Sequence, residues 1–214
     1  METDSEEQGV SGMTGDFDME LPNLGDDRPG LEELEDDLDV DDVVEEEDDD
    51  DYPEDAAEED IDLVVALYRE DGQPVVLALD AELANDFEGL IAQLRRVPGD
   101  GGAIGMVSLA TEVFVLVRVR GKHVQVLLSD AGAADDWPIA RDVLDYLGIE
   151  LSEDEEDDAY PAGDLEMLAD AGLPDFELEA IAANYDEDSV TLLEQIAERV
   201  KFGREFTRAV AALG

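Results

Sequence analysis

Residues 113–130 read VFVLVRVRGKHVQVLLSD, and this stretch decides the fold. Two runs rich in valine and leucine flank the pair Gly121 and Lys122, a pattern typical of a β-hairpin closed by a two-residue turn. Because such a turn fixes how the two strands pair, the stretch also predicts its own register. The predicted cross-strand pairs are Arg120 with His123, Arg118 with Gln125, and Leu116 with Leu127.

This register assigns the side chains of the hairpin to two faces. Successive residues of a strand point to opposite sides, so every second residue shares a face. One face carries Phe114 and Leu116 and, toward the tip, the basic residues, which we expect to be solvated. The opposite face carries only apolar residues and is predicted to be a core covered by helices: Val113, Val115, Val117, Val119, Val124, Val126 and Leu128.

Around this hairpin, residues 61–149 form a predicted α+β module with a mainly antiparallel sheet and two helices. The runs IDLVVALYRED and PVVLALD are separated near Asp71 and Gly72, which indicates a second hairpin. The apolar run AIGMVSLA, residues 103–110, is a further predicted strand. These strands together supply the sheet.

Two helices of the module are predicted from periodicity and caps. Apolar residues at helical spacing predict a helix over residues 83–96. A second helix is expected to carry Trp137 and to end at Gly148, with Asp135 or Asp136 as its N-cap. Both helices are expected to cover the valine face of the sheet.

An acidic linker over residues 150–162 separates this module from a predicted helical module over residues 163–214. Asp188 or Ser189 is the predicted cap of its third helix. Short helices of this kind bury their apolar faces either against one another, as a small C-terminal bundle, or against the sheet. The four helical segments are DLEMLADAG, DFELEAIAANY, SVTLLEQIAERVKF and REFTRAVAAL.

Residues 1–60 are predicted to be an acidic disordered segment. They hold 29 of the 62 Asp and Glu residues of the chain and one basic residue, Arg28. Low hydrophobicity combined with high charge cannot bury enough surface to offset chain entropy. The alternative is a short recognition helix, because Leu31, Leu34 and Leu38 have helical spacing.

The formal net charge of −50 limits the classes of partner. Such a chain is repelled by nucleic-acid phosphates and by anionic membranes, so we expect no direct nucleic-acid binding and no membrane association. Basic protein surfaces are its electrostatic complement. Without a basic, apolar signal peptide at its start or a run of about 20 apolar residues, the chain is predicted to be cytoplasmic.

The absence of cysteine and the presence of one histidine, His123, limit the chemistry. Thiol nucleophiles and thiolate metal sites are excluded, and the zinc site of a base deaminase cannot be built. The glycine-rich PGDGGAIG, residues 98–105, leads from a helix into a strand, the reverse of a phosphate-binding loop, and is interpreted as a tight turn. We predict no catalytic residue, no cofactor and no metal.

Five residues are candidates for partner interaction instead. Arg118, Arg120, Lys122 and His123 gather at the hairpin tip. Trp137 is either a packed core residue or an interface residue, since tryptophan is enriched among binding hot spots. A further hypothesis is that the acidic tracts of the chain itself cover the basic tip.

Several stretches beyond residue 60 resemble a known family. The chain is similar to the actinobacterial tRNA adenosine deaminase-associated proteins across nearly all of residues 61–214. This resemblance implies an association with the deaminase in the context of tRNA modification. The stretches that carry it are LVVALYREDGQPVVLAL, PGDGGAIGMVSLATEVFVLVRVRG, LLSDAGAADDWPIARDVLDYLGI, PAGDLEMLADAGLP and LLEQIAERVKFGREF.

We therefore expect a non-catalytic accessory or regulatory protein whose partner is the deaminase or another basic protein. The alternative is an acidic nucleic-acid mimic that binds basic partner surfaces. A third hypothesis, which the residues do not favour, is an enzyme that uses carboxylates alone, because carboxylate pairs in so acidic a chain prove nothing.

Overall fold

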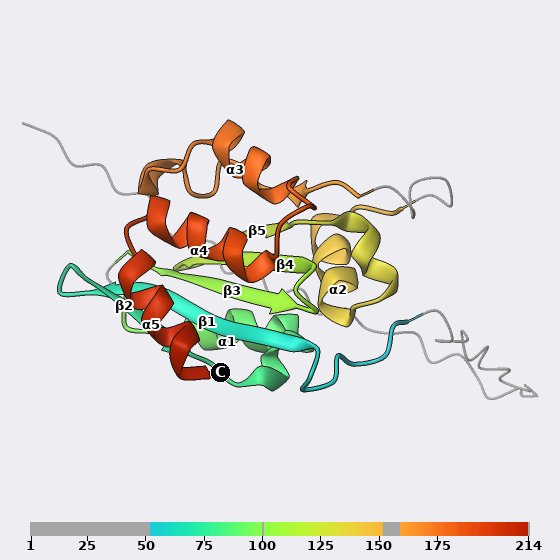
Figure 1. Ribbon diagram of the computed structural model, residues 1–214, viewed down its shortest axis with the longest axis horizontal. Coiled ribbons are helices and arrows are strands. Elements are labelled where there is room, and N and C mark those ends of the chain that lie inside the picture. The colour runs from blue at the N-terminus through green and yellow to red at the C-terminus, as the bar shows by residue number, and fades with distance from the viewer. Residues whose placement is uncertain (1–51, 100, 152–158, 214) are drawn as a thin grey trace, which may run out of the picture. The chain divides into compact units, whose positions relative to one another are not determined.

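A six-stranded antiparallel sheet forms the centre of the computed structural model, which describes residues 52–99, 101–151 and 159–213 (Figure 1). The strand order is β2-β1-β3-β4-β5-β6. The predicted α+β class is confirmed. The strands are β1 (Ile61–Glu70), β2 (Gln73–Ala78), β3 (Ala103–Leu109), β4 (Val113–Arg120), β5 (His123–Leu128) and β6 (Ala162–Gly163).

Most of the predicted acidic segment lies outside the described residues. Of residues 1–60, only 52–60 are described. Within this short stretch, Ala56 is buried, and its backbone N–H and C=O both bond to the side-chain amide of Asn85, at 2.8 and 3.0 Å. The last residues of the predicted acidic segment therefore pack onto the fold.

Both predicted hairpins are confirmed. In β4 and β5 the pairs are those expected from the sequence, with Arg120 opposite His123 across the turn. The turn between β1 and β2 places Asp71 and Gly72 at φ values of 51° and 77°. Two successive positive φ values match the right-handed twist of a hairpin, and Asp and Gly are residues that tolerate this conformation.

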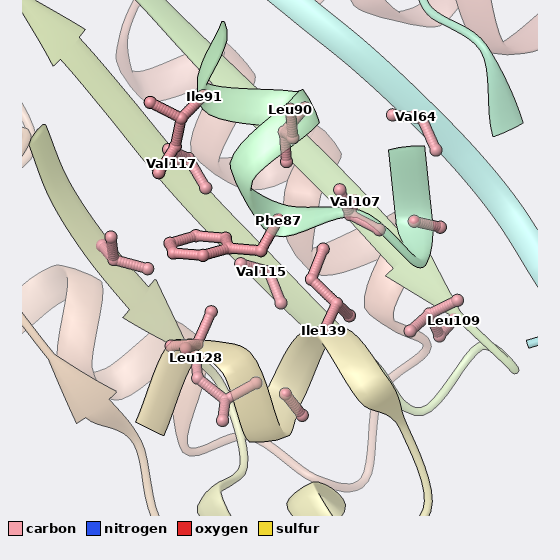
Figure 2. Packing of buried hydrophobic residues seen from close by; sticks show 14 of the residues in the cluster. Val64, Phe87, Leu90, Ile91, Val107, Leu109, Val115, Val117, Leu128 and Ile139 are labelled. Carbon is pink, nitrogen blue, oxygen red and sulfur yellow. The ribbon is translucent and has the colours of Figure 1, made fainter. Parts of the chain in front are cut away.

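One face of the sheet carries the predicted valine core. Helices α1 (Phe87–Leu94) and α2 (Pro138–Leu147) cover it and contribute Phe87, Leu90 and Ile139 (Figure 2). In Figure 2, Phe87 lies over Val115 of β4. The odd-numbered residues of β4 are all buried in this cluster, so the register expected from the hairpin sets the core.

The opposite face of the sheet is also covered. Its helices are α3 (Asp175–Ala182), α4 (Ser189–Arg199) and α5 (Gly203–Leu213) (Figure 1). They pack on Phe114 and Leu116 in a second apolar cluster. The sequence left two packing modes open for the C-terminal helices, and the structure shows packing against the sheet. Helix α4 contacts β3 and β4, and α5 contacts β2.

Two predicted helix starts differ from the structure. The expected helix over residues 83–96 is divided into a 3₁₀ turn, η2 (Ala81–Ala84), and α1, because Asp86 interrupts it and caps α1 by accepting a 2.7 Å hydrogen bond from the Gly89 N–H. Neither Asp135 nor Asp136 caps α2, whose N-cap is Trp137. The residues before it form a separate 3₁₀ turn, η3 (Ala131–Asp135), which buries three alanines. The chain up to Asp135 is therefore not part of α2.

The first of the four predicted C-terminal helices is wrong. Its residues form turns and a single 3₁₀ turn, η4 (Ala169–Ala171), which Gly172 ends at a φ of 101°. The Asp164 carboxylate accepts the Glu166 N–H at 2.9 Å at the start of these turns. Here Met167 and Leu168 are instead buried in the second cluster, which holds the segment on the sheet.

A buried polar network fastens α4 to the sheet. The hydroxyl oxygens of Ser108 in β3 and Ser189 in α4 lie 2.7 Å apart, and Ser108 also donates to the Asp62 carboxylate at 2.9 Å. The same carboxylate accepts the Thr111 N–H at 2.7 Å. Asp188 is the cap of α4, as one of the two predicted candidates, and accepts from the Val190 N–H at 2.9 Å.

Two phenylalanines of the C-terminal helices provide a test of this packing. Phe206 in α5 is 1% exposed, whereas Phe176 in α3 is 64% exposed. Phe206→Ala should lower the free energy of unfolding by about 3–5 kcal/mol, since it leaves a cavity in the second cluster. Phe176→Ala should change it by less than about 0.5 kcal/mol. Denaturant unfolding followed by circular dichroism measures both, and equal effects would contradict the packing of α5 on the sheet.

Candidate functional site

The basic residues singled out by the sequence lie at one end of the sheet, which we call the basic end. Strand register places Tyr68, Val119 and Val124 in one row across β1, β4 and β5. Arg69 and Arg120 each follow that row by one residue. The basic end therefore gathers the predicted Arg118, Arg120, Lys122 and His123 and adds Arg69.

Arg118 is buried, so the expectation that it is solvated is wrong. It is 8% exposed, and its guanidinium group donates to the Met167 carbonyl and to both carboxylate oxygens of Asp170. The bond from Nη2 to Oδ2 is 2.9 Å long. The pair fastens η4 to β4, because η4 covers this end of the sheet and excludes water from Arg118.

The other residues of the hairpin tip are exposed, as expected. Arg120 donates to the Asp170 carboxylate at 3.1 Å and to the side chain of Gln125 at 3.0 Å. Lys122 and His123 are exposed at the turn itself. Their interaction with a partner stays a prediction.

Asp170 is the carboxylate shared by the two arginines of β4. The hydrogen bond from Arg118 holds the pKa of Asp170 below its usual value, and the charges of Arg118 and Arg120 act in the same direction, while partial burial opposes them. The charged form of Asp170 is therefore favoured by the fold.

Trp137 lies away from the basic end. As the N-cap of α2 it is partly buried and packs against the first apolar cluster. Of the two alternatives predicted from the sequence, this position agrees with a residue packed on the core. A role of Trp137 at an interface is untested.

A groove between α1 and α2 is the second candidate site. Its volume is about 640 Å³, and it lies on the outer side of the helix layer that covers the valine core. Phe87 and Ile91 form its floor, and Tyr146, which is 51% exposed, packs its ring edge-on at 5.4 Å from the Phe87 ring. Charged residues at the rim are Glu88, Arg95, Asp142 and Asp145.

Tyr52 is bound at the rim of this groove. Its hydroxyl group donates a 2.7 Å hydrogen bond to the Asp142 carboxylate. Partial burial, the bond to Asp142 and the nearby carboxylate charges together raise the pKa of Tyr52 to about 12. Tyr52, the first of the described residues, is therefore hydrogen-bonded beside the groove.

The sequence pattern does not single out Arg69 or Tyr146. Arg69 is an isolated basic residue before a turn, and only the pairing of β1 with β3 brings it to the end of the sheet where Arg118 lies. Tyr146 stands beside inward-facing positions of a helix, where an aromatic residue is usually assigned to the core. It lies three residues after the buried Val143, on the same side of the helix, so helical spacing alone does not indicate its exposure.

The buried polar side chains of the described residues have partners within the fold. They are Ser108, Arg118, Ser129 and Ser189. Within the same residues, no group of three acidic, histidine or cysteine side chains is placed to hold a metal ion. The described helices include none that is long and apolar enough to cross a membrane.

Comparisons with known proteins identify relatives of this chain. A family model described as Rv3753c-like tRNA adenosine deaminase-associated protein matches residues 62–203. Protein Rv3753c of Mycobacterium tuberculosis is 32% identical over 152 residues, which are 70% of this chain and 88% of that protein. No solved structure matches the chain. The family match includes both the basic end and the groove.

The pairing of Asp170 with Arg118 predicts a pH-dependent contribution to stability. Asp170→Asn should lower the free energy of unfolding by about 1–2 kcal/mol at neutral pH, because it weakens charged hydrogen bonds of a partly exposed pair. A carboxylate with a lowered folded pKa stabilises fully above its unfolded pKa of about 3.9 and loses this contribution as the pH falls further. The difference from the unmodified protein should therefore shrink below about pH 4.

Denaturant unfolding of both proteins between neutral pH and pH 3 measures this difference. Asp186→Asn removes an exposed carboxylate elsewhere on the surface and serves as the matched control. A deficit of Asp170→Asn that is independent of pH would contradict the charge pairing.

Proposed function

The chain belongs to the Rv3753c-like tRNA adenosine deaminase-associated protein family, and on that basis we propose that it is a non-catalytic accessory protein that binds the deaminase and regulates its access to tRNA. The observation that supports this proposal best is the groove between α1 and α2. It combines an apolar floor with a rim that is mainly acidic. This combination suits a basic protein segment with an apolar side chain.

The charge of the fold supports a basic partner. The described residues hold 31 Asp and Glu residues against 11 Lys and Arg residues. An enzyme that binds tRNA must present lysine and arginine side chains to the phosphates. Such a surface attracts an acidic protein, and this attraction raises the rate of association and orients the encounter.

The groove provides the specific contact that charge alone lacks. Tyr146 is half exposed beside Phe87, so a partner side chain that fills the groove buries the exposed part of its ring. Aromatic side chains that become buried at the centre of an interface contribute most of its binding energy. Glu88, Asp142 and Asp145 then pair with basic residues around that centre. The occupant is a basic segment of the deaminase.

The arrangement of buried polar groups supports a binding role. Ser108 and Ser189 belong to the hydrogen-bond network that holds α4 on the sheet. The Ser129 hydroxyl oxygen accepts a 2.9 Å hydrogen bond from the Phe114 N–H. Arg118 is fixed by Met167 and Asp170. A general base or nucleophile needs an available group in a pocket, and these four have structural partners.

An acidic nucleic-acid mimic is the second candidate function, and the net charge of −50 favours it. The two candidates differ in how binding responds to salt. Charge alone is screened over about 8 Å at physiological ionic strength, so a mimic loses its affinity steeply as salt rises. Binding through contact of the groove with an apolar side chain, by contrast, is retained as the salt concentration rises.

Tyr146→Ala tests the groove directly. With the purified deaminase of the same organism, this substitution should weaken binding about tenfold or more, as expected for the loss of a buried aromatic contact. Phe176→Ala removes a more exposed aromatic ring from α3, on the other side of the sheet, and should leave the affinity unchanged. Isothermal titration calorimetry measures both, with thermal unfolding as the check that each variant is folded.

The rate of tRNA deamination tests regulation. Adding the protein should change this rate, and Tyr146→Ala should reduce the change in proportion to its loss of affinity. Failure of the unmodified protein to bind the deaminase even at low salt would refute the proposed function. Binding that is insensitive to Tyr146→Ala and vanishes at about 0.5 M salt would favour the mimic.

A further inference from the structure

A cavity of about 310 Å³ lies at the basic end, between the strands and the segments that cover their second face. Arg69 of β1 and Arg118 of β4 both line it, and Asp170 of η4 and Phe202 lie opposite the strands. Its volume is at the lower limit for small-molecule sites in proteins, about 300 Å³. The cavity lies on the opposite side of the sheet from the groove between α1 and α2.

Arg69 is held in place without a carboxylate partner among the described residues. Its guanidinium group donates to the Val200 carbonyl at 3.2 Å and to the Gly72 carbonyl at 3.5 Å. It also lies 4.8 Å from the centre of the Phe202 ring. This half-buried guanidinium group thus has a positive charge that no carboxylate among the described residues pairs with, which is unexpected in a chain with 62 acidic residues.

The remaining charges at the cavity do not cancel that of Arg69. Arg118 and Arg120 share the single carboxylate of Asp170. Among the described residues that line the cavity, the guanidinium groups of Arg69 and Arg118 therefore lie with the one carboxylate of Asp170. The described residues that line the cavity thus carry one more positive than negative charge, whereas Glu70 and Asp71 follow Arg69 at the exposed turn of its hairpin.

The glycine-rich loop before β3 closes one side of the cavity. Gly101 and Gly102 both line it. Gly102 has a φ of +87°, and a Cβ atom there would lie 2.1 Å from the Val119 carbonyl oxygen and 2.8 Å from Cγ of Arg120. Only glycine fits so close to β4, so Gly102 brings its backbone next to Arg120.

We propose that this cavity binds an oxyanion group, a phosphate or a carboxylate, between Arg69 and Arg118. Guanidinium groups bind such groups through pairs of parallel hydrogen bonds. Arg69 has three N–H groups beyond the two that bond to carbonyls, and its fixed position lowers the entropy lost on binding. Partial burial strengthens the attraction, because the cavity is less polar than water.

Two sources of this oxyanion are consistent with the chemistry. One is a small phosphate-bearing molecule from solution. The other is a carboxylate of residues 45–51, which read EEEDDDD in the same chain. In the second case the site would be filled from within, and an added anion would have to compete.

Pyrophosphate added to the full-length protein tests the proposal. Calorimetry at low ionic strength should show saturable binding that Arg69→Met weakens at least tenfold, while Arg69→Lys retains part of it. Arg96→Met removes an exposed arginine after α1 and should have no effect. In the unmodified protein, NMR signals of the Arg69 and Arg118 guanidinium groups should shift with pyrophosphate, and those of Arg96 should not.

A full-length variant with residues 45–51 changed to Gln and Asn separates the two sources. Tighter pyrophosphate binding by this variant would identify the chain's own carboxylates as the occupant, and equal binding would identify a free anion. Absence of saturable binding and of guanidinium shifts in both proteins would overturn the proposal. Equal weakening by Arg96→Met and Arg69→Met would also overturn the proposal, because it would show nonspecific electrostatic attraction and no defined binding site.

Discussion

Both faces of the sheet are apolar, and the need to cover both is the constraint on which the rest of the structure depends. Every residue of β3 is buried, and in β4 only Arg120 is exposed. Helices α1 and α2 exclude water from one face, and the segments after β6 exclude it from the other. The many acidic residues are thereby left to the outer surface, where water and salt screen their repulsion.

Covering the second face creates a problem at its end, where β4 carries arginines instead of valine or leucine. A buried guanidinium group is costly unless it is paired and hydrogen-bonded. Asp170 and the Met167 carbonyl supply these partners to Arg118, and both belong to the irregular segment around η4. The same contacts explain why this segment forms turns and not the predicted helix, since its backbone must follow the end of the sheet.

The groove and the cavity lie on opposite sides of one rigid sheet and differ in charge. The groove has an acidic rim and an apolar floor, which suit a basic protein, whereas the cavity holds Arg69, without a carboxylate partner among the described residues, beside the paired Arg118. Because the two sites lie on opposite sides of the sheet, substitutions of Tyr146 and of Arg69 test the two proposals separately.

Local patterns of the sequence determined the hairpins, their register and the valine core, because alternation and two-residue turns depend only on neighbouring residues. The composition also excluded thiol chemistry and the zinc site of a base deaminase, since the chain has no cysteine and one histidine. Only the tertiary structure decided that the C-terminal helices cover the second face, that Arg118 is buried, and that Arg69 lies beside it. These facts depend on which distant segments meet: β1 and β4 are joined through β3, and η4 reaches Arg118 from some 50 residues away. No local periodicity encodes such contacts, since burial of the whole sheet selects them.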